Sequence, residues 1–337
     1  MVCLVHVTRL QGSPDEKVIG VCVAPEGSNV KANVVVATST SVSAWTQKGE
    51  ATFVRRKLGV VDNSIKGVAV TKEGYVIGSL SDGCSRAWGI ESGSSKVSRM
   101  PGDGGKSGGR CLGLTHDGLV IGGGEDGSLT IRTQQGKLVK GGTINAHKDA
   151  IVSVHGSPCA DKPYFATASL DGTVKIFTMV GMKRLQTLKP STTSKATSVI
   201  LSPDSSLCAI GYKDGKCALY DASTGFLWEY DMGKPISQIC FSPNRYWMCA
   251  ATSEGFKIVD LENKVMINED SFYQDHTDAG GEWGDVAHEE ERRLQEDAAS
   301  SKSPGLKPCT SLCWSNDGEM LYVGYENGDV HVYKVRV

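Results

Sequence analysis

Three residues near the middle of the chain, His147, Ser169 and Asp171, have the side chains of a Ser-His-Asp nucleophile set. In such a set the imidazole removes the hydroxyl proton and the carboxylate orients the imidazole. A second segment, GDGGKSGG at 102–109, resembles a phosphate-binding loop. The pattern G-x-x-x-x-G-K-[ST] requires Gly where this chain has Met100, and the strand-like RCLGLTHDG follows where a helix is needed. The segment is therefore better interpreted as a connection between strands.

The eleven Cys and seven His residues match no metal-binding pattern. Cys309 and Cys313 lie four residues apart in one strand-like segment, so we expect them on the same face, without a second pair nearby. His276 and His288 lack the H-E-x-x-H spacing. An odd number of scattered Cys and the absence of an N-x-[ST] sequence favour a reducing compartment. We expect no metal, no cofactor and no small-molecule substrate.

The composition excludes several classes of protein. The chain has 337 residues, of which 39% are hydrophobic and 22% charged, and its net charge is −2. A uniformly basic nucleic-acid binder is excluded, although a local basic face is not. No apolar run reaches the ~18–20 residues of a membrane span, and the N-terminal MVCLVHVTRL is too short and polar for a signal peptide. These features predict a cytoplasmic protein that has no membrane partner.

A repeated strand–turn–strand unit explains the forty Gly residues, because Asp-Gly and Asn-Gly pairs form tight hairpin turns. The copies are YVIGSLSDG (75–83), LVIGGGEDG (119–127), YFATASLDG (164–172), LCAIGYKDG (207–215), WMCAATSEG (247–255), MLYVGYENG (320–328) and the degraded NVVVATSTS (33–41). Their turn positions are Ser39, Asp82, Asp126, Asp171, Asp214, Glu254 and Asn327. Six of the seven units follow one another at about 40–45 residues, which is the period of WD-repeat β-propellers. The sequence thus predicts an all-β, seven-bladed propeller that forms a single domain over residues 1–337.

The remaining N-terminal strand-like segment, near Cys3 to Leu10, has no blade of its own. We expect it to pair into the last blade and to close the ring, because closure removes free sheet edges. Within the fourth blade, His147, Ser169, Asp171 and the aromatic Phe177 occupy the positions of a structural hydrogen-bond tetrad typical of WD repeats. This interpretation replaces the nucleophile set and predicts a protein that is not an enzyme. Only the fourth blade keeps the His, so we expect the other blades to keep the turn without the tetrad.

The spacing between the last two turn positions, Glu254 and Asn327, exceeds one repeat because of an acidic insertion at 268–307. It contains eleven acidic and four basic residues, a net charge of −7. We expect a partly helical or disordered segment, which either has no partner or folds on binding one. Without the insertion the body has a net charge of +5, and its densest cationic run is Arg55-Arg56-Lys57. This run is either a solvated rim or a phosphate-binding patch, to which Lys31 and Lys66 lie nearby in the sequence.

Four segments are similar, nearly phrase for phrase, to the fifth through seventh blades of the receptor for activated C kinase family: SPDSSLCAIGYKDG, QICFSPNRYWMCAAT, KIVDLENK and CTSLCWSNDGEMLYVGY. That family is the seven-bladed WD-repeat scaffold of the small ribosomal subunit. The similarity is strong over 196–325, apart from the insertion, and weaker but in register elsewhere. The family also has an extended loop between its last two blades.

This resemblance implies a non-catalytic adaptor on the head of the small subunit. It implies contact with ribosomal RNA and ribosomal proteins through the early blades, and recruitment of protein kinases and translation regulators. The family's Arg-Asp-Lys motif in the first-blade turn corresponds here to Thr38, Ser39 and Thr40, so both cations are absent. Its second basic contact corresponds to Arg55-Arg56-Lys57, at the start of the second blade. These three residues, with Lys31 and Lys66, are therefore the predicted RNA-binding residues.

Two alternatives belong to other classes of protein. One is a free cytosolic signalling adaptor, resembling a heterotrimeric G-protein β subunit in role, that does not bind the ribosome. Such subunits have an N-terminal coiled-coil helix, whereas this chain begins with a strand-like segment. The other is an enzyme built on a propeller, which would need convergent acid, base or metal-binding groups that the sequence does not show.

Overall fold

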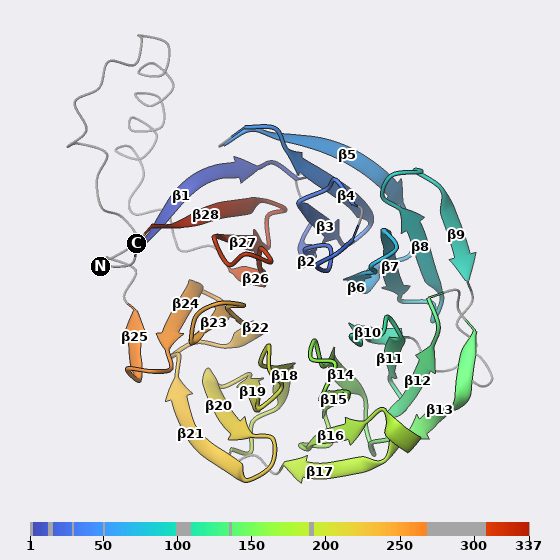
Figure 1. Ribbon diagram of the computed structural model, residues 1–337, viewed down its shortest axis with the longest axis vertical. Helices are drawn as coiled ribbons and strands as arrows, with labels where there is room; N and C mark the ends of the chain where they lie inside the picture. Colours follow the sequence, from blue (N-terminus) through green and yellow to red (C-terminus); the bar gives the residue numbers. More distant parts are fainter. Residues whose placement is uncertain are drawn as a thin grey trace.

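The structure is a computed structural model that describes residues 3–12, 16–28, 30–49, 51–98, 109–134, 137–188, 192–267 and 308–336. Over these residues the chain forms seven four-stranded antiparallel sheets arranged around a central axis (Figure 1). The expected seven-bladed propeller is confirmed. The acidic insertion at 268–307 and the Gly-rich residues 102–108 lie outside the described residues.

The first three blades are listed from the inner to the outer strand. Blade one consists of β2 (Val18–Cys22), β3 (Val34–Thr38), β4 (Ser41–Gln47) and β5 (Phe53–Val60). Blade two consists of β6 (Ile65–Val70), β7 (Tyr75–Leu80), β8 (Ser85–Gly89) and β9 (Ser95–Ser98). Blade three consists of β10 (Gly109–Leu114), β11 (Val120–Gly124), β12 (Ser128–Arg132) and β13 (Leu138–Asn145).

The other four blades follow the same order. Blade four consists of β14 (Ile151–Gly156), β15 (Tyr164–Ser169), β16 (Val174–Thr178) and β17 (Arg184–Leu188), with the 3-10 turn η1 (Val180–Met182) before β17. Blade five consists of β18 (Ala196–Leu201), β19 (Leu207–Tyr212), β20 (Lys216–Asp221) and β21 (Gly225–Asp231). Blade six consists of β22 (Ile236–Phe241), β23 (Trp247–Thr252), β24 (Gly255–Asp260) and β25 (Val265–Ile267). Blade seven consists of β26 (Cys309–Trp314), β27 (Met320–Tyr325), β28 (Val330–Arg336) and β1 (Cys3–Leu10).

The second strand of a blade is the most deeply buried. All residues of β3, β11 and β23 are buried, since these strands have neighbours in their own sheet and in the adjacent blades. Such strands read as continuous apolar or small-residue runs rather than as alternating ones. The core is consequently divided into clusters between blades, as in the cluster that joins blades six and seven.

The N-terminal strand closes the ring. β1 pairs antiparallel with β28 from Cys3 opposite Arg336 to Leu10 opposite Val330, and Figure 1 shows the two termini side by side. The expected closure is thereby confirmed. Arg9 also forms an ion pair of 2.7 Å with Asp329 of the last blade.

Each inner strand contains an irregularity that the sequence did not reveal. In all seven blades the pairing of the first two strands shifts register near the start of the inner strand. In blade seven the shift lies between Cys309 and Ser311, and a one-residue bulge reverses the faces of the residues that follow. The expectation that Cys309 and Cys313 share a face was therefore wrong. Cys309 packs in the cluster between blades six and seven, and Cys313 packs in the cluster between blades seven and one.

Side chains on the inner strands join neighbouring blades from blade four round to blade one. In each case a side-chain oxygen accepts a backbone N–H from the next blade. The pairs are Ser153 with Val199 (3.1 Å), Ser198 with Ile239 (3.3 Å), Gln238 with Leu312 (2.9 Å) and Ser311 with Val21 (2.9 Å). Blades one and two have Gly20 and Gly67 at this position, where an added Cβ at Gly20 would lie 2.3 Å from Cγ1 of Val68. At Gly20 the backbone of blade one instead lies directly against the side chain of Val68 in blade two.

Candidate functional site

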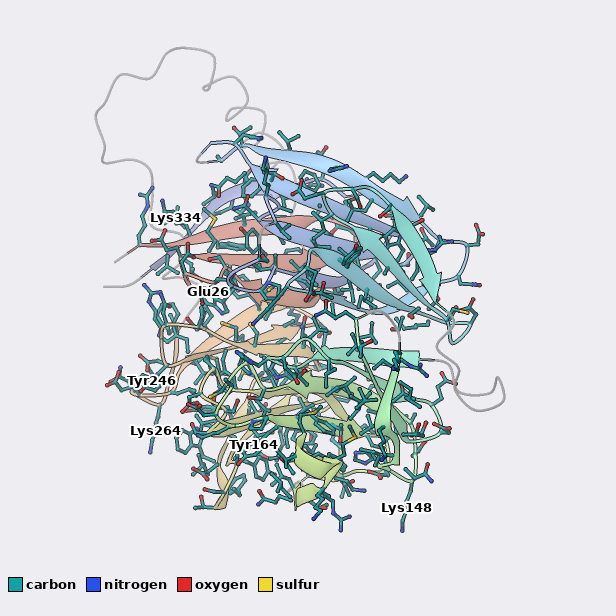
Figure 2. The ribbon with its side chains drawn as sticks, turned by 45° about the vertical axis from the view of Figure 1, so that its right-hand side comes forward. Glu26, Lys148, Tyr164, Tyr246, Lys264 and Lys334 are labelled. Atoms are coloured by element: carbon teal, nitrogen blue, oxygen red, sulfur yellow. The ribbon has the colours of Figure 1, made fainter. Side chains whose placement is uncertain are left out.

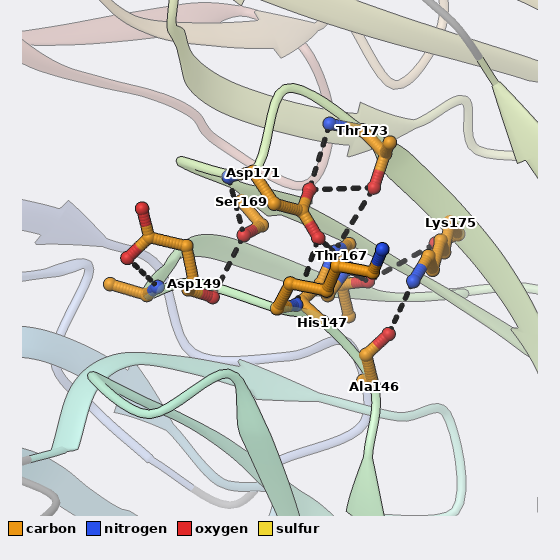
Figure 3. Close-up of polar contacts among 10 residues, drawn as sticks. Ala146, His147, Asp149, Thr167, Ser169, Asp171, Thr173 and Lys175 are labelled. Atoms are coloured by element: carbon orange, nitrogen blue, oxygen red, sulfur yellow. Dashed lines mark hydrogen bonds and ion pairs between the residues drawn. The ribbon is translucent and has the colours of Figure 1, made fainter.

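Blade four contains a hydrogen-bonded cluster that holds the start of the blade to its β15–β16 turn (Figure 3). His147 precedes β14, and its Nδ1 lies 3.0 Å from Oδ2 of Asp171. The other ring nitrogen, Nε2, lies 2.8 Å from the hydroxyl of Thr167. Asp171 also accepts the backbone N–H of Lys148 at 3.0 Å and the hydroxyl of Thr173 at 2.7 Å. We call His147, Thr167, Asp171 and Thr173 the blade-four clasp.

The structure places Ser169 at a different point of this network from the one the sequence suggested. Its hydroxyl donates to the backbone oxygen of Asp149 and accepts the N–H of Asp171. The hydroxyl in contact with His147 belongs to Thr167, two residues earlier on β15. Phe177 is 3% exposed and stacks on Phe165 at 5.0 Å, so it supports the cluster by packing and not by a hydrogen bond.

The pKa shifts of His147 and Asp171 favour the protonation states that their hydrogen bonds require. Burial lowers the pKa of His147 and outweighs the opposite effect of Asp171, so the imidazole is neutral at pH 7. Burial alone would raise the pKa of Asp171, but hydrogen bonds from Thr173 and the N–H of Lys148 lower it well below its usual range. Because the carboxylate can only accept, Nδ1 carries the imidazole proton and Nε2 accepts from Thr167.

Thr167, His147 and Asp171 are connected in the order hydroxyl, imidazole, carboxylate, which is also the order in a Ser-His-Asp nucleophile set. The surroundings of these residues do not suit a nucleophile. Thr167 has no exposed surface, so its hydroxyl is closed to a substrate. A nucleophile needs an accessible reacting atom next to donors for an oxyanion. The pocket between blades seven and one is lined by Leu10, Val36, Trp45, Arg55 and their neighbours, and is separate from the clasp. The geometry of the clasp thus fits a brace within the blade.

Other blades use different pairs of residues to join the segment before the blade to the turn between its second and third strands. The contacts are Asn63 with Asp82 at 2.7 Å in blade two, Thr192 with Asp214 at 2.8 Å in blade five, and Lys234 with Glu254 at 2.6 Å in blade six. The turn carboxylates of Asp82, Asp126 and Asp214 each also accept the backbone N–H two residues later. Asn327 instead donates to the side chain of Asp329. In blades two, five and six the turn residue is therefore held to the segment before the blade even though the His is missing.

Blade one reverses the polarity of the clasp. Here the carboxylate, Glu16, lies on the segment that precedes the blade, and hydroxyls on the β3–β4 turn donate to it. Thr40 donates at 2.8 Å and Ser41 at 3.0 Å, and Thr38 donates as well. Burial would raise the pKa of Glu16, but these hydroxyls and the nearby Lys57 lower it. The negative charge of Glu16 thus lies against the turn that corresponds to the resembling family's Arg-Asp-Lys motif.

The cationic run lies on β5, the outer strand of blade one, and not within blade two. Arg55, Arg56 and Lys57 are all exposed. Arg55 is held in place, since its Nε donates to Ser43 at 3.1 Å and its guanidinium carbon lies 5.6 Å from the centre of the Trp45 ring. Arg55 also borders the pocket toward blade seven.

The period of two residues in a strand separates the three cations. Arg55 and Lys57 face the side of Glu16 and blade seven, whereas Arg56 faces blade two, where an added Cβ at Gly93 would lie 3.3 Å from its guanidinium. A further cation, Arg86 on β8, donates to the backbone oxygen of Val60 at the end of β5. Arg86 is not among the residues predicted from the sequence. The signal for it is the position of β8, the third strand of blade two, against the outer strand of blade one.

Lys31 lies in the β2–β3 loop of blade one, whereas Lys66 lies on β6, the inner strand of blade two. Lys31 is exposed before the start of β3, where its backbone N–H donates to Glu91. Lys66 follows Ile65, whose N–H donates to the oxygen of Ser39 just after the end of β3. Arg86 therefore lies near the cations of β5. Lys31 and Lys66, the other two predicted RNA-binding residues, do not.

Further features bear on the class of protein. The Cys residues whose side chains the structure describes are free, and burial raises the pKa of Cys208 and of Cys217 to about 12. Within the described ranges, no cluster of three or more His, Cys, Asp or Glu residues is arranged to hold a metal ion. No helix in the described part of the chain has the length and apolar character needed to cross a membrane.

Three segments of the chain, 139–178, 182–221 and 303–334, match the family described as "WD domain, G-beta repeat". The small ribosomal subunit protein RACK1y of Oryza sativa subsp. japonica is 35% identical over 195 residues, which cover 58% of this chain and 50% of that protein. The small ribosomal subunit protein RACK1 of Caenorhabditis elegans is 36% identical over 197 residues, covering 58% and 53%. The chain thus spans about half the length of these curated relatives. A third relative, RACK1z of Oryza sativa subsp. japonica, is 41% identical over 138 residues, which cover 41% of this chain and 34% of that protein.

A solved structure supports the fold alone. The WD40 β-propeller domain of Doa1 superposes with a TM-score of 0.74 over 98% of this chain and 97% of that chain, at 16% identity. The repeat register, the seven closed blades and the similarity to the curated relatives agree with one another. The chain is a seven-bladed WD-repeat protein that is similar, over part of its length, to the RACK1 small ribosomal subunit proteins.

Proposed function

We propose that this protein is a non-catalytic scaffold that binds the small ribosomal subunit in the cytoplasm and links it to signalling proteins. The observation that carries the proposal is the similarity to proteins named as RACK1 small ribosomal subunit proteins. Ribosomal RNA and ribosomal proteins are the partners on the ribosome. Protein kinases and translation regulators are the partners recruited to it.

The proposed RNA contact is the outer edge of blade one. Arg55, Arg56 and Lys57 are exposed along β5, and Arg86 lies at the end of that strand. Guanidinium groups suit phosphate because they form two parallel hydrogen bonds with it. Arg55 is already oriented by Trp45 and Ser43, so less side-chain entropy is lost when it binds. We place Lys31 and Lys66 outside this contact, because Lys31 lies in the β2–β3 loop and Lys66 lies on β6, the inner strand of blade two.

A second candidate function is a free cytosolic adaptor that does not bind the ribosome. It is favoured by blade one, where Glu16 accepts hydrogen bonds from the hydroxyls of the turn that corresponds to the family's basic motif. An ionised carboxylate at this turn repels phosphate. If the turn is required for docking, the β5 cations alone are too few to hold the protein on the subunit.

Sedimentation of the wild-type protein with purified small subunits over a range of salt concentrations separates these two functions. If it binds RNA, binding should weaken with a log–log slope of roughly 0.7–0.9 per phosphate contact, because counterions return to the RNA. Binding that persists unchanged at high salt would contradict an RNA contact made by cations. A protein that stays in the supernatant at every salt concentration would support the free adaptor.

A further inference from the structure

The outer strands of the propeller differ in how their free edges are protected. An unpaired edge can bind another strand, and proteins commonly block it with Lys or Arg side chains. The long outer strands β1, β5 and β13 carry such cations, namely Arg9, the β5 run and Lys140. Among the outer strands of seven or more residues in the described part of the chain, β21 alone has no Lys or Arg. All four strands have a pairing irregularity, so a bulge does not distinguish β21.

The first half of β21 is an exposed apolar surface. Phe226 is 53% exposed and Leu227 is 37% exposed. Phe226 packs edge-on against Tyr220 with ring centres 5.5 Å apart, and Nζ of Lys264 from blade six lies 4.7 Å from the ring of Trp228. These contacts hold the aromatic side chains in position before any partner binds, which reduces the entropy cost of binding.

The neighbouring loops of blade six extend this surface. Tyr246 is 71% exposed, and its backbone oxygen accepts the N–H of Leu261 at 2.7 Å. This contact joins the β22–β23 loop to the β24–β25 turn that carries Lys264. Figure 2 shows Tyr246 and Lys264 on the same edge of the molecule. Val265, next to Lys264, is 52% exposed. Exposed apolar patches of this kind mark interaction sites.

Both ends of β21 are acidic. Asp221 lies opposite Gly225 at the start of the strand, and the hydroxyl of Ser223 with the N–H of Thr224 holds its pKa below its usual range. Asp231, at the end of the strand, is exposed. Glu229 is paired with Lys216 at 2.8 Å, so its charge is balanced. A partner that runs along β21 would therefore meet negative charge at each end and apolar side chains between them.

We propose that the free edge of β21 is a docking site for an extended peptide segment of a protein partner. The segment adds to blade five as a further strand, is apolar at its centre and has a Lys or Arg near each end. Seven paired residues correspond to a length of roughly 23 Å. Backbone hydrogen bonds provide affinity in this type of recognition, and alternate side chains provide specificity. The inference rests on the scaffold part of the proposed function and does not require ribosome binding, because β21 and β5 lie on opposite sides of the ring (Figure 1).

The test uses the full chain and a blocked seven-residue peptide that alternates valine and threonine between two terminal lysines. Binding is measured by fluorescence polarisation. We expect Leu227→Lys to weaken binding by about tenfold or more, since it places a blocking cation at the edge. Leu138→Lys, at a 43% exposed position on the outer strand β13, is the matched control and should bind like wild type. A peptide with every backbone nitrogen methylated should not bind, because it has no N–H left on either edge to donate to a strand.

Equal binding to the wild type and to Leu227→Lys, or equal binding of the methylated peptide, would overturn the proposal. So would a lack of binding to the wild-type chain. Sedimentation velocity without peptide tests whether a second copy of this chain occupies the edge instead. A dimer that Leu227→Lys dissociates and Leu138→Lys does not would contradict a peptide partner. These outcomes do not depend on small subunits, so failure here is distinguishable from failure of ribosome binding.

Discussion

Blades four and one use the same two positions, the segment before the blade and the turn between its second and third strands, with opposite polarity. In blade four a neutral His147 before the blade meets the carboxylate of Asp171 on the turn. In blade one the carboxylate of Glu16 comes before the blade and the turn supplies hydroxyls. The side chains of His147 and Asp171 in the blade-four clasp are 0% and 8% exposed, whereas Glu16 is half-buried. Contacts at these positions in blades one, two, four, five and six use different residue pairs. The fold therefore does not fix their chemistry, and the charge at the turn can change from blade to blade.

The strongest test of this difference is the loss of the carboxylate in blade four. Asp171→Ala leaves His147, Thr173 and the N–H of Lys148 without their acceptor. We expect a loss of roughly 3 kcal/mol in the free energy of unfolding, because the buried imidazole donor of His147 is left unsatisfied and two further hydrogen bonds are lost. Urea denaturation followed by intrinsic fluorescence measures it. A loss below about 0.5 kcal/mol, the size expected for a surface substitution, would show that the clasp does not brace the blade.

The two clasps should also differ in their response to acid. Burial lowers the pKa of His147, and it lowers the pKa of His155, also in blade four, to about 4. Nδ1 of His155 accepts the N–H of Leu201 from blade five, which requires an unprotonated nitrogen. The unfolded chain binds these protons near pH 6.5 while the folded chain does not. The stability is therefore complete above pH 6.5 and falls as the pH drops toward 4, by roughly 2–3 kcal/mol for His155.

Unfolding measured between pH 7 and 4.5 tests this dependence with His155→Asn, which keeps an acceptor that does not take up a proton in this range. The variant should lose less stability than the wild type over the same interval. His116→Asn, at an exposed position, is the control and should follow the wild type. Parallel curves for the wild type and His155→Asn would contradict a role for the buried imidazole. Glu16 has a lowered pKa, so the blade-one clasp should persist through this interval and weaken only at lower pH.

Removal of the blade-one carboxylate should have a smaller effect than Asp171→Ala. Glu16→Ala leaves Thr38, Thr40 and Ser41 without this acceptor, but water can reach the partly exposed site and replace it. We expect a loss of about 1 kcal/mol, measured by the same urea denaturation. If Glu16→Ala destabilises the protein as much as Asp171→Ala, the distinction between a buried and a solvated clasp is wrong.

The smallest expected effect is a change in affinity for small subunits when the charge of Glu16 is removed. Glu16→Gln removes a negative charge near Lys57 while keeping a hydrogen-bond acceptor for the turn. If β5 contacts RNA, affinity for small subunits should increase by about 2–5-fold at low salt, and the increase should disappear at high salt because of screening. Glu326→Gln, at an exposed residue paired with Lys17, is the matched control. An equal change for both variants would indicate a general charge effect instead of one located at the blade-one turn.

Spacing in the sequence predicted the parts of the fold that depend on turns. The Asp-Gly and Asn-Gly pairs require backbone with positive φ, as at Gly172, where φ is 80°, and they recur at one period. The N-terminal closure followed because Cys3–Leu10 had no partner in its own sequence neighbourhood. The bulges in the inner strands were not predictable, since no special turn residue accompanies them, and they reversed the relative faces of Cys309 and Cys313.

The candidate sites were less predictable because they depend on contacts between distant segments. Ser169 and Thr167 lie two residues apart on β15 and so share a face, and only the three-dimensional reach of His147 selects Thr167. Glu16 and Thr40 belong to different strand connections, and neither resembles the His–Asp pair of blade four. Arg86 joins the β5 cations only through the packing of blade two against blade one. The remaining site residues stay predictions until RNA binding is measured.

The central claim is that the cations on β5 hold this protein on the small ribosomal subunit. The most direct measurement is co-sedimentation with small subunits at moderate salt for Arg55→Glu, Arg56→Glu and Lys57→Glu combined. The matched control combines Lys140→Glu, Lys183→Glu and Arg184→Glu, which make the same charge change at exposed positions in blades three and four. We expect the β5 variant to leave the pellet and the control to remain bound like wild type, with both proteins folded. Equal retention, or equal release, of the two variants would contradict the claim that β5 is the RNA contact.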